Sequence, residues 1–254
     1  MQEELVEIFT TDLNFKNNSE FYNFLKLQTL KNNIALTNKQ ILKYVEFLKF
    51  LVLWNKKTNL TSIVKFEDMV NKHIVDSLLV LKTFKFEAFK NNFLDVGAGA
   101  GFPSTPIAIL EIFQNVFQID CLKKRVEFLL FIKKQLNLKT TPIHARAEDL
   151  AKKERFKEKI DVVAARAVSK LNVLSELSIP FVKLNGFFVA LKGPEYETDL
   201  NSAENAIKTL GAKIEKIEKF EIEDNKRTII LIKKISHTST KYPRNYSKIL
   251  KNPI

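Results

Sequence analysis

The sequence predicts an α/β protein in which helices cover both faces of a mostly parallel sheet. From residue 93 onward, short apolar runs alternate with longer runs of helical period, and this alternation is typical of parallel sheets. In the same region, a glycine-rich turn stands between the first strand-like run and a helix-like run. That order indicates a ligand site at the carboxyl ends of the strands.

Six runs have the length and composition of strands, and helix-like runs separate most of them. The strand-like runs are Phe93–Val96, Val116–Ile119, Pro142–His144, Asp161–Ala164, Phe187–Leu191 and Arg227–Ile232. The helix-like runs are Ile107–Phe113, Lys123–Leu136, Leu171–Val182 and Thr198–Leu210.

The first part of the chain has a helical character. Thr37 and Gln40 have the spacing of a capping box, and the apolar residues after them recur with the period of a helix. A second helix is expected from about Phe66 to Leu81. The first twenty or so residues are acidic and weakly patterned, so we expect a loosely attached extension. The predicted organisation is an N-terminal extension at 1–36, a helical region at 37–92, a ligand-binding sheet domain at 93–236 and a basic tail at 237–254.

The net charge of +12, from 41 Lys and Arg against 29 Asp and Glu, points to a polyanionic partner. The total is a weak indication, because most of these cations are lysines in a chain that is also rich in Asn, Ile and Phe. The distribution is more informative. From Asn225 to the C-terminus there are eight Lys or Arg and no acid, which favours a nucleic-acid partner.

Other classes of protein are disfavoured by composition. Cys121 is the single cysteine, so neither an intrachain disulfide nor a cysteine zinc site is possible, and we expect no metal. No apolar run approaches the length of a membrane span, and Met1-Gln2-Glu3-Glu4 is acidic where a signal peptide would be positive. We expect a cytoplasmic protein with no membrane partner.

The glycine-rich turn at Asp95–Phe102 reads D-V-G-A-G-A-G-F, with glycines at Gly97, Gly99 and Gly101. A dinucleotide-binding fingerprint needs a further glycine where Phe102 or Ser104 stands, and no phosphate-loop lysine follows. An acid followed by G-x-G-x-G resembles motif I of the class I methyltransferases that use S-adenosylmethionine. An ordinary glycine turn of an α/β protein is the plain alternative.

Three later positions fit the same kind of site. Asp120 ends the second strand-like run, where a carboxylate can accept both hydroxyls of a ribose. Ala147 and Glu148 follow the third run, in a loop that covers the adenine in class I methyltransferases. Arg166 ends the fourth run at the ligand edge and can pair with a carboxylate or a phosphate. The alternatives are a solvated acid, acids at a helix N-terminus and a structural ion pair.

Five ordered segments together resemble one family, the bacterial small-subunit (16S) ribosomal RNA guanine-N7 methyltransferases, historically named for glucose-inhibited division protein B. They cover about residues 40–254. The segments are Trp54–Thr61, like W-N-x-x-x-N-L-T; Lys72–Leu78, like K-H-x-x-D-S-L; Asp95–Pro103, like D-V-G-x-G-x-G-F-P; Ala165–Ala167 with Ala190–Gly193, like S-R-A and A-L-K-G; and the tail Lys241–Arg244 with Lys251–Ile254, like K-Y-P-R and K-x-P-[IL].

The resemblance implies a Rossmann-like fold with a seven-stranded sheet, an enzyme that methylates guanine N7 in small-subunit ribosomal RNA, and S-adenosylmethionine as cofactor. The cofactor-binding residues it implies, with the glycines of the turn, are Gly97, Gly99, Gly101, Phe102, Asp120, Ala147, Glu148 and Arg166. Two departures stand out. Ser104 replaces a usual glycine, and Asn245-Tyr246-Ser247 replaces a small turn that contains glycine.

Guanine N7 has a free lone pair, so no general base is required, and we identify no catalytic acid or base. His73 is better explained as a half-buried tether between the helical region and the sheet domain than as a catalytic group. Trp54 is better explained as core than as a stacking platform. The candidates for RNA binding, of which the first three fit a solvated basic face equally well, are Lys123, Lys124, Arg125, Lys192, Arg244 and Lys251.

Three other functions fit the sequence less well. A class I methyltransferase of another substrate is disfavoured by the basic tail and the ordered motifs. A non-catalytic RNA- or ribosome-binding protein of the same fold would have lost cofactor residues that this chain retains. An NAD-linked oxidoreductase fails on glycine spacing. We expect a monomer that acts on small-subunit ribosomal RNA or on the assembling ribosomal subunit.

Overall fold

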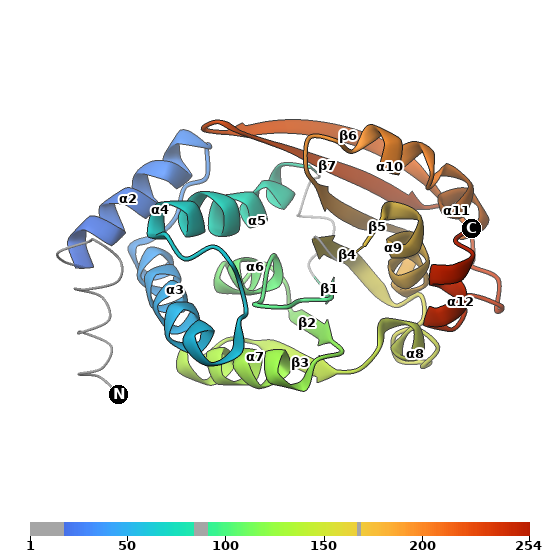
Figure 1. Cartoon of the computed structure of the whole chain (residues 1–254), viewed down its shortest axis with the longest axis horizontal. Coiled ribbons are helices and arrows are strands. Elements are labelled where there is room, and N and C mark those ends of the chain that lie inside the picture. Colours follow the sequence, from blue (N-terminus) through green and yellow to red (C-terminus); the bar gives the residue numbers. More distant parts are fainter. Residues whose placement is uncertain (1–17, 84–90, 167–168) are drawn as a thin grey trace.

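A seven-stranded sheet in the order β3-β2-β1-β4-β5-β7-β6 forms the centre of the computed structural model (Figure 1), which describes residues 18–83, 91–166 and 169–254. The strands from β3 to β5 are parallel to one another, whereas β7 is antiparallel to both β5 and β6. This confirms the predicted mostly parallel sheet. The strands are β1 (Asn92–Val96), β2 (Asn115–Asp120), β3 (Thr140–His144), β4 (Ile160–Arg166), β5 (Val182–Lys192), β6 (Ala212–Ile222) and β7 (Asn225–Lys234).

Helices lie on both faces of this sheet (Figure 1). Before β1 come α2 (Asn18–Lys31), α3 (Asn38–Thr58), and a continuous helical segment made of α4 (Phe66–Met69), the π-helix η1 (Val70–Val75), α5 (Asp76–Leu78) and the 3₁₀ helix η2 (Leu79–Lys82). Then follow α6 (Ser104–Ile109), α7 (Lys123–Gln135), α8 (Ala147–Leu150), α9 (Leu171–Ser178), the 3₁₀ helix η4 (Ile179–Phe181), α10 (Glu197–Asn201), α11 (Glu204–Thr209) and α12 (Tyr246–Lys251). Within the described ranges, no helix has the length and apolar character needed to cross a membrane.

The central strands bury both faces, as the alternation of β4 illustrates. Val162 and Ala164 belong to one hydrophobic core, whereas Val163 and Ala165 belong to the other. Side chains of a strand alternate between the two faces of its sheet, so a strand that is covered on both sides has a continuous apolar sequence. This explains why Asp161–Ala164 is recognisable as a strand from sequence alone.

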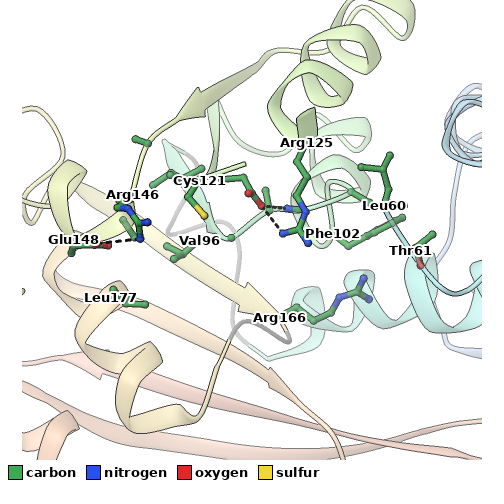
Figure 2. Close-up of a pocket in the computed structure, with 18 of the residues that line it drawn as sticks. Leu60, Thr61, Val96, Phe102, Cys121, Arg125, Arg146, Glu148, Arg166 and Leu177 are labelled. Atoms are coloured by element: carbon green, nitrogen blue, oxygen red, sulfur yellow. Dashed lines mark hydrogen bonds and ion pairs between the residues drawn. The ribbon is translucent and has the colours of Figure 1, made fainter. Parts of the chain in front are cut away.

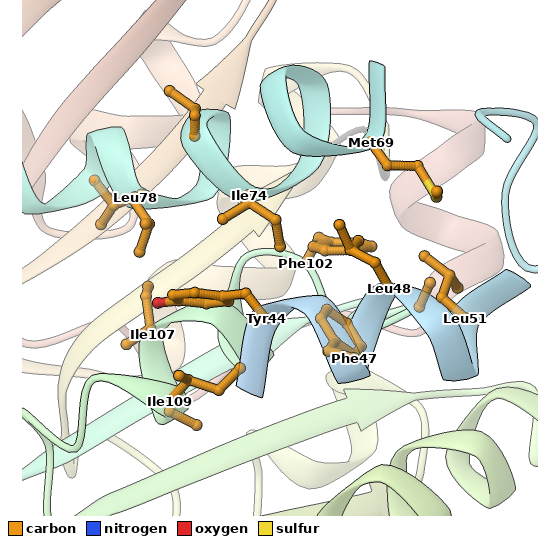
Figure 3. Packing of buried hydrophobic residues seen from close by; sticks show 14 of the residues in the cluster. Tyr44, Phe47, Leu48, Leu51, Met69, Ile74, Leu78, Phe102, Ile107 and Ile109 are labelled. Carbon is orange, nitrogen blue, oxygen red and sulfur yellow. The ribbon is translucent and has the colours of Figure 1, made fainter. Parts of the chain in front are cut away.

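The N-terminal helices cover one face of the sheet. In Figure 3, Tyr44, Phe47 and Leu48 of α3 lie between the α4–α5 segment and α6. The hydroxyl of Tyr44 donates a hydrogen bond to the carbonyl oxygen of Pro106 at 2.8 Å, which satisfies a fully buried polar group. The predicted capping box of α3 is present, with Thr37 and Gln40 each bonding the other's backbone N–H.

The structure differs from the sequence prediction in several places. Part of the predicted extension at 1–36 forms α2, whose Phe21 and Leu25 are buried. The loose attachment expected for the first twenty or so residues stays a prediction, because residues 1–17 lie outside the described residues. The helix expected at about 66–81 contains a π-helical turn. Strand β6 is absent from the prediction, because Lys and Glu interrupt its apolar residues on an exposed edge strand and leave no apolar run.

The C-terminal tail folds back onto the sheet domain, where α12 lies beside α9 (Figure 1). The guanidinium of Arg244 bonds both carboxylate oxygens of Glu176, with Nη2 at 2.6 Å from Oε2, and the backbone N–H of Arg244 donates to Oε1 at 2.8 Å. Glu176 is fully buried in α9, and Ile249 of α12 is fully buried as well. A buried ion pair and an apolar contact therefore anchor the tail.

Replacing Arg244 by alanine is expected to destabilise the fold by about 3–5 kcal/mol, because the buried Glu176 carboxylate loses its partner. Urea unfolding followed by circular dichroism measures this change. The control is Lys251→Ala, at an exposed position of the same tail. The double variant Arg244→Ala/Glu176→Leu should recover much of the stability, and a failure to do so would show that the loss does not come from the buried charge.

Candidate functional site

A cavity of about 440 Å³ opens at the carboxyl ends of β1, β2 and β4 (Figure 2). The chain reverses its direction of strand addition between β1 and β4, and ligands of parallel sheets bind at such a switch point. The wall is formed by Leu60, Thr61, His73, Val96, Gly97, Ala98, Gly99, Ala100, Phe102, Ile119, Asp120, Cys121, Arg125, Ala145, Arg146, Ala147, Glu148, Arg166, Leu177 and Tyr246.

The glycine-rich turn forms the floor of this cavity. Gly97, Gly99 and Gly101 have φ angles of 74°, 57° and 90°, in the left-handed region that residues with a side chain rarely adopt. The N–H groups of Gly97 and Ala98 both donate to the carbonyl oxygen of Ile119 at 2.9 Å, which ties the turn to β2. A Cβ placed on Gly99 would meet nothing closer than 3.8 Å, so its absence leaves room for a ligand beside the backbone.

Asp120, at the end of β2, presents a buried carboxylate to the turn. Its Oδ2 accepts from the N–H of Gly99 at 2.9 Å and from Arg125 at 3.2 Å, and its Oδ1 accepts from the N–H of Leu122 at 2.9 Å. The carboxylate is therefore fixed in direction by two backbone donors. Each carboxylate oxygen can accept more than one hydrogen bond, so acceptor capacity remains for ligand hydroxyls.

One end of the cavity combines an acid, an arginine and an aromatic ring. Glu148 of α8 is buried and lies 3.9 Å from a guanidinium nitrogen of Arg146 (Figure 2). The same guanidinium lies 5.7 Å from the ring centroid of Tyr246, which comes from the C-terminal tail. Leu177 of α9 completes this end. A flat, partly apolar group with a polar edge fits between these residues.

The other end contains Arg166 and residues of the N-terminal helical region. Arg166 Nη1 donates to the carbonyl oxygen of Lys72 and to Asp76 Oδ2, both at 2.9 Å, and Nη2 lies 3.1 Å from His73 Nδ1. The guanidinium is 5.0 Å from the ring centroid of Phe102. Arg166 thus joins the end of β4 to the π-helical turn η1.

Asp95 supports the turn from below and does not line the cavity. Its Oδ2 accepts from the N–H of Ser104 at 3.1 Å, and Oδ1 has no partner among the described residues. Complete burial raises the pKa of Asp95 to about 6, against the opposing hydrogen bonds from Ser104. At the same point, the hydroxyl of Ser104 accepts from Gln118 at 3.0 Å, so the side chain that replaces a usual glycine is buried and bonded.

The cavity brings together seven of the eight residues predicted to bind a cofactor. Gly97, Gly99, Phe102, Asp120, Ala147, Glu148 and Arg166 line it, whereas Gly101 belongs to the same turn but faces Thr105 and Leu129 and is not part of the lining. Sequence reasoning did not place Arg146, Leu177 or Tyr246 here. Leu60 and Thr61 lie in a motif that was recognised, but nothing in their spacing indicated a ligand site. Ala167 of the S-R-A-like segment lies outside the described residues.

The predicted RNA-binding residues differ in whether their charged groups are exposed or already bonded within the chain. Lys123, Lys124 and Lys251 are exposed, and the exposed Lys123 ammonium also lies 3.9 Å from Glu127. By contrast, the Lys192 ammonium bonds Asp199 at 2.6 Å and the carbonyl oxygen of Ser169 at 3.0 Å. Arg125 pairs with Asp120, and Arg244 pairs with Glu176. These three cations are already engaged within the chain, and their assignment to RNA stays a prediction.

His73 and Trp54 behave as the sequence suggested. His73 connects the helical region to β4 through Arg166, although it is buried rather than half-buried. Its ring also stacks on Phe102, with centroids 4.3 Å apart and an interplanar angle of 21°. Trp54 packs in the core, 4.8 Å from the ring of Phe131 and 5.7 Å from that of Phe128. Among the described residues, no cluster of three His, Cys, Asp or Glu could hold a metal.

Comparisons with known proteins agree on one family. The family model described as GidB, rRNA small subunit methyltransferase G, matches residues 37–230. The ribosomal RNA small subunit methyltransferase G of Clostridium kluyveri is 44% identical over 216 residues, which are 84% of this chain and 91% of that protein. The protein of the same name from Clostridium beijerinckii is 40% identical over 240 residues, 92% of this chain and 99% of that protein.

Solved structures give a weaker likeness. The crystal structure of M. jannaschii TYW2 in complex with AdoMet has a TM-score of 0.46 and 18% identity, and the match covers 62% of this chain and 74% of that one. The assignment of the fold rests instead on the strand order and on the family match.

The variant Gly101→Ala is expected to destabilise the protein by about 1–3 kcal/mol, since Gly101 has a φ of 90° and its Cβ would lie 2.2 Å from Thr105 Oγ1. Thermal unfolding measures the loss. Gly193→Ala is the matched control, because a Cβ there meets nothing within 4 Å. Equal midpoints for the two variants would show that the turn tolerates a side chain.

Burial, together with the nearby charge of Arg166, lowers the pKa of His73 from 6.5 to about 3. Below pH 6.5 the unfolded chain therefore takes up a proton that the folded chain does not, and the free energy of unfolding falls as the pH falls, by about 1.4 kcal/mol per pH unit at full effect. We expect wild type to lose stability relative to His73→Asn between pH 6.5 and 4. Urea unfolding at each pH gives the free energy of unfolding of both proteins. A constant difference in this free energy between pH 6.5 and 4 would refute the prediction.

Proposed function

Because this chain belongs to the rRNA small subunit methyltransferase G family, we propose that it transfers a methyl group from S-adenosylmethionine to N7 of a guanine in small-subunit ribosomal RNA. The observation that supports this best is the cavity at the β1/β4 switch point. It unites the glycine-rich turn, the Asp120 carboxylate and Arg166, as a nucleoside cofactor with an amino-acid tail requires.

The residues present fit that cofactor. Asp120 would accept the ribose hydroxyls, and Glu148 with the backbone around Ala147 would face the adenine between Leu177 and Tyr246. The space that a Cβ of Gly99 would fill allows the ligand to approach the backbone. Arg166 would hold the carboxylate of the methionine moiety, because its guanidinium lies at the opposite end of the cavity.

This methyl transfer requires no general acid or general base from the chain. S-adenosylmethionine supplies, when bound, an electrophilic methyl group on a sulfonium. Guanine N7 attacks with its own lone pair, so the chain needs to orient the two reactants in line and to exclude water. Positioning of this kind contributes up to about 7–11 kcal/mol to lowering a barrier. Phe102 and Leu60, at the Arg166 end of the cavity, supply apolar surface that would exclude water.

The partner would be bound through lysines on the outer surface. Lys123 and Lys124 open α7 beside the cavity, and Lys251 lies in the basic tail. Contacts of this type to phosphates make binding strongly salt-dependent. The target guanine must be unpaired or flipped to reach the cavity. We further propose a cytoplasmic monomer that acts on ribosomal RNA, naked or within the assembling subunit.

Two other functions account for less of the structure. A methyltransferase of another substrate would use Tyr246 of the tail in the same way, but the exposed lysines of the tail would have no polyanionic partner, and such an enzyme would share only the fold with this family. A non-catalytic ribosome-binding protein of the same fold would have no reason to retain the Asp120 carboxylate, fixed by two backbone donors.

Primer extension on borohydride-reduced, aniline-cleaved ribosomal RNA tests the proposal. Cleavage occurs at N7-methylguanosine, so RNA from cells with this chain should give a stop at one small-subunit guanine that RNA from cells lacking it does not. We expect Arg166→Ala to lower the initial methylation rate at least about tenfold, because a charge-assisted contact to the cofactor is lost.

The control for this experiment is Arg155→Ala, which removes an exposed arginine outside the cavity and should restore the stop fully. An identical cleavage pattern in cells with and without the chain would disprove methylation of guanine N7 in ribosomal RNA. Binding of S-adenosylhomocysteine to the purified protein would then decide whether the chain is a methyltransferase of another substrate.

A further inference from the structure

The π-helical turn η1 and the first residue of α5 place three polar partners around the guanidinium of Arg166. Three contacts come from the carbonyl of Lys72, the ring of His73 and the carboxylate of Asp76. All three belong to the N-terminal helical region, whereas Arg166 ends a strand of the sheet. Short π-helical turns within α-helices are frequent at functional sites.

The protonation state of His73 follows from its neighbours. His73 Nδ1 lies 3.1 Å from Nη2 of Arg166, which can only donate, and 3.2 Å from the carbonyl oxygen of Lys72, which can only accept. The Lys72 carbonyl already accepts from Arg166 Nη1 at 2.9 Å and the guanidinium contact is the shorter of the two, so we assign Nδ1 as the acceptor for Nη2. The proton of the neutral ring is then on Nε2, which donates to the hydroxyl oxygen of Thr61 at 3.0 Å. The lowered pKa of His73 agrees with a neutral ring. His73 is thus fixed as an acceptor for Arg166 from one side and held by Thr61 from the other.

Asp76 fixes the same guanidinium through charge. Its Oδ2 lies 2.9 Å from Arg166 Nη1, and its Oδ1 lies 3.1 Å from Nε of Arg227, at the start of β7. The Asp76 side chain is only 7% exposed. One buried carboxylate between two arginines leaves a net positive charge, so the cluster favours an anionic ligand more than an internal ion pair would.

The contacts occupy only part of what Arg166 can donate. A guanidinium has five N–H donors, and three of them are engaged in the bonds to Lys72, His73 and Asp76. Nε has no hydrogen bond among the described residues. Arg166 lines the cavity, and these two remaining N–H groups have no partner among the described residues. The fixed geometry spares a bound ligand the entropy cost of ordering a long side chain.

We propose that His73 and Asp76 are positioning residues, which hold Arg166 so that its remaining donors receive the carboxylate of the cofactor. The inference rests on the proposed function, in which Arg166 binds that carboxylate. It assigns the N-terminal helical region a direct part in cofactor binding, in addition to covering one face of the sheet. Phe102, in contact with both the His73 ring and the guanidinium, limits movement of both groups.

Two ligands that differ by the amino-acid tail test this proposal. S-adenosylhomocysteine has the carboxylate, whereas 5′-methylthioadenosine has the same adenosine thioether without it. Isothermal titration calorimetry on the full chain gives both dissociation constants. We expect His73→Phe and Asp76→Asn to weaken binding of S-adenosylhomocysteine at least about tenfold and of 5′-methylthioadenosine by less than about twofold.

Two further variants control for side effects. His73→Asn keeps an acceptor close to the position of Nδ1 and should bind both ligands almost as wild type does, while His73→Phe keeps only the stacking. Asp68→Asn removes an acid of the same helical segment that pairs with Lys72 and not with Arg166, and should change neither constant. His73 and Asp76 contact different atoms of Arg166, so one correctly folded variant of the two is sufficient.

The outcomes separate this inference from the proposed function. If Arg166→Ala selectively loses S-adenosylhomocysteine while His73→Phe and Asp76→Asn bind it as wild type does, the positioning roles are wrong and the proposed function stands. If these two variants lose both ligands equally, their role is structural only and the inference is overturned. If Arg166→Ala binds both ligands normally, the assignment of Arg166 to the carboxylate fails, and the inference fails with it.

Discussion

Burial of both faces of the central strands is the constraint on which the rest of this structure depends. In β4, every residue from Ile160 to Ala165 is buried, and β1 and β5 are covered in the same way. A charged side chain within such a strand lacks solvent, as the raised pKa of Asp95 illustrates. Charges that meet a ligand are therefore found where strands end, at Asp120 and Arg166. The position of the site is a consequence of how the sheet is covered.

The parts of the fold and site that can be predicted from sequence are those with a local signal. A strand buried on both faces has a continuous apolar run, and three glycines within five residues indicate a backbone that a ligand approaches closely. Most of the strands and cofactor residues around the site could therefore be inferred. The strand β6 has no such signal, because at the sheet edge its alternation of Lys, Glu and Ile also suits an exposed helix. The π-helical turn η1 has no local signal either. Its sequence has the ordinary periodicity of an α-helix, and the contacts of Lys72 and His73 with Arg166 come from a distant part of the chain.

The place of Tyr246 in the cavity could not be predicted from the sequence. It stands in a segment that departs from the family pattern, far along the chain from the glycine turn, and it reaches the cavity only because Arg244 and Ile249 dock the tail. Charge was also a poor guide to individual residues. Five of the six arginines form ion pairs with carboxylates of the same chain, at Asp76, Asp120, Glu148 and Glu176. Arginine matches a carboxylate in shape, whereas the exposed positive charge is left mainly to lysine.

The docked tail also has a consequence for the order in which the protein is built. Every parallel strand, the glycine turn and the helical region precede residue 193 in the chain, so the sheet and the floor of the cavity can form while the ribosome is still adding residues. Tyr246, which forms one wall of the cavity, is synthesised only after β7. A chain that stops before this point lacks Tyr246, so this side of the cavity is open. The ligand site is therefore complete only when synthesis of the chain is nearly complete.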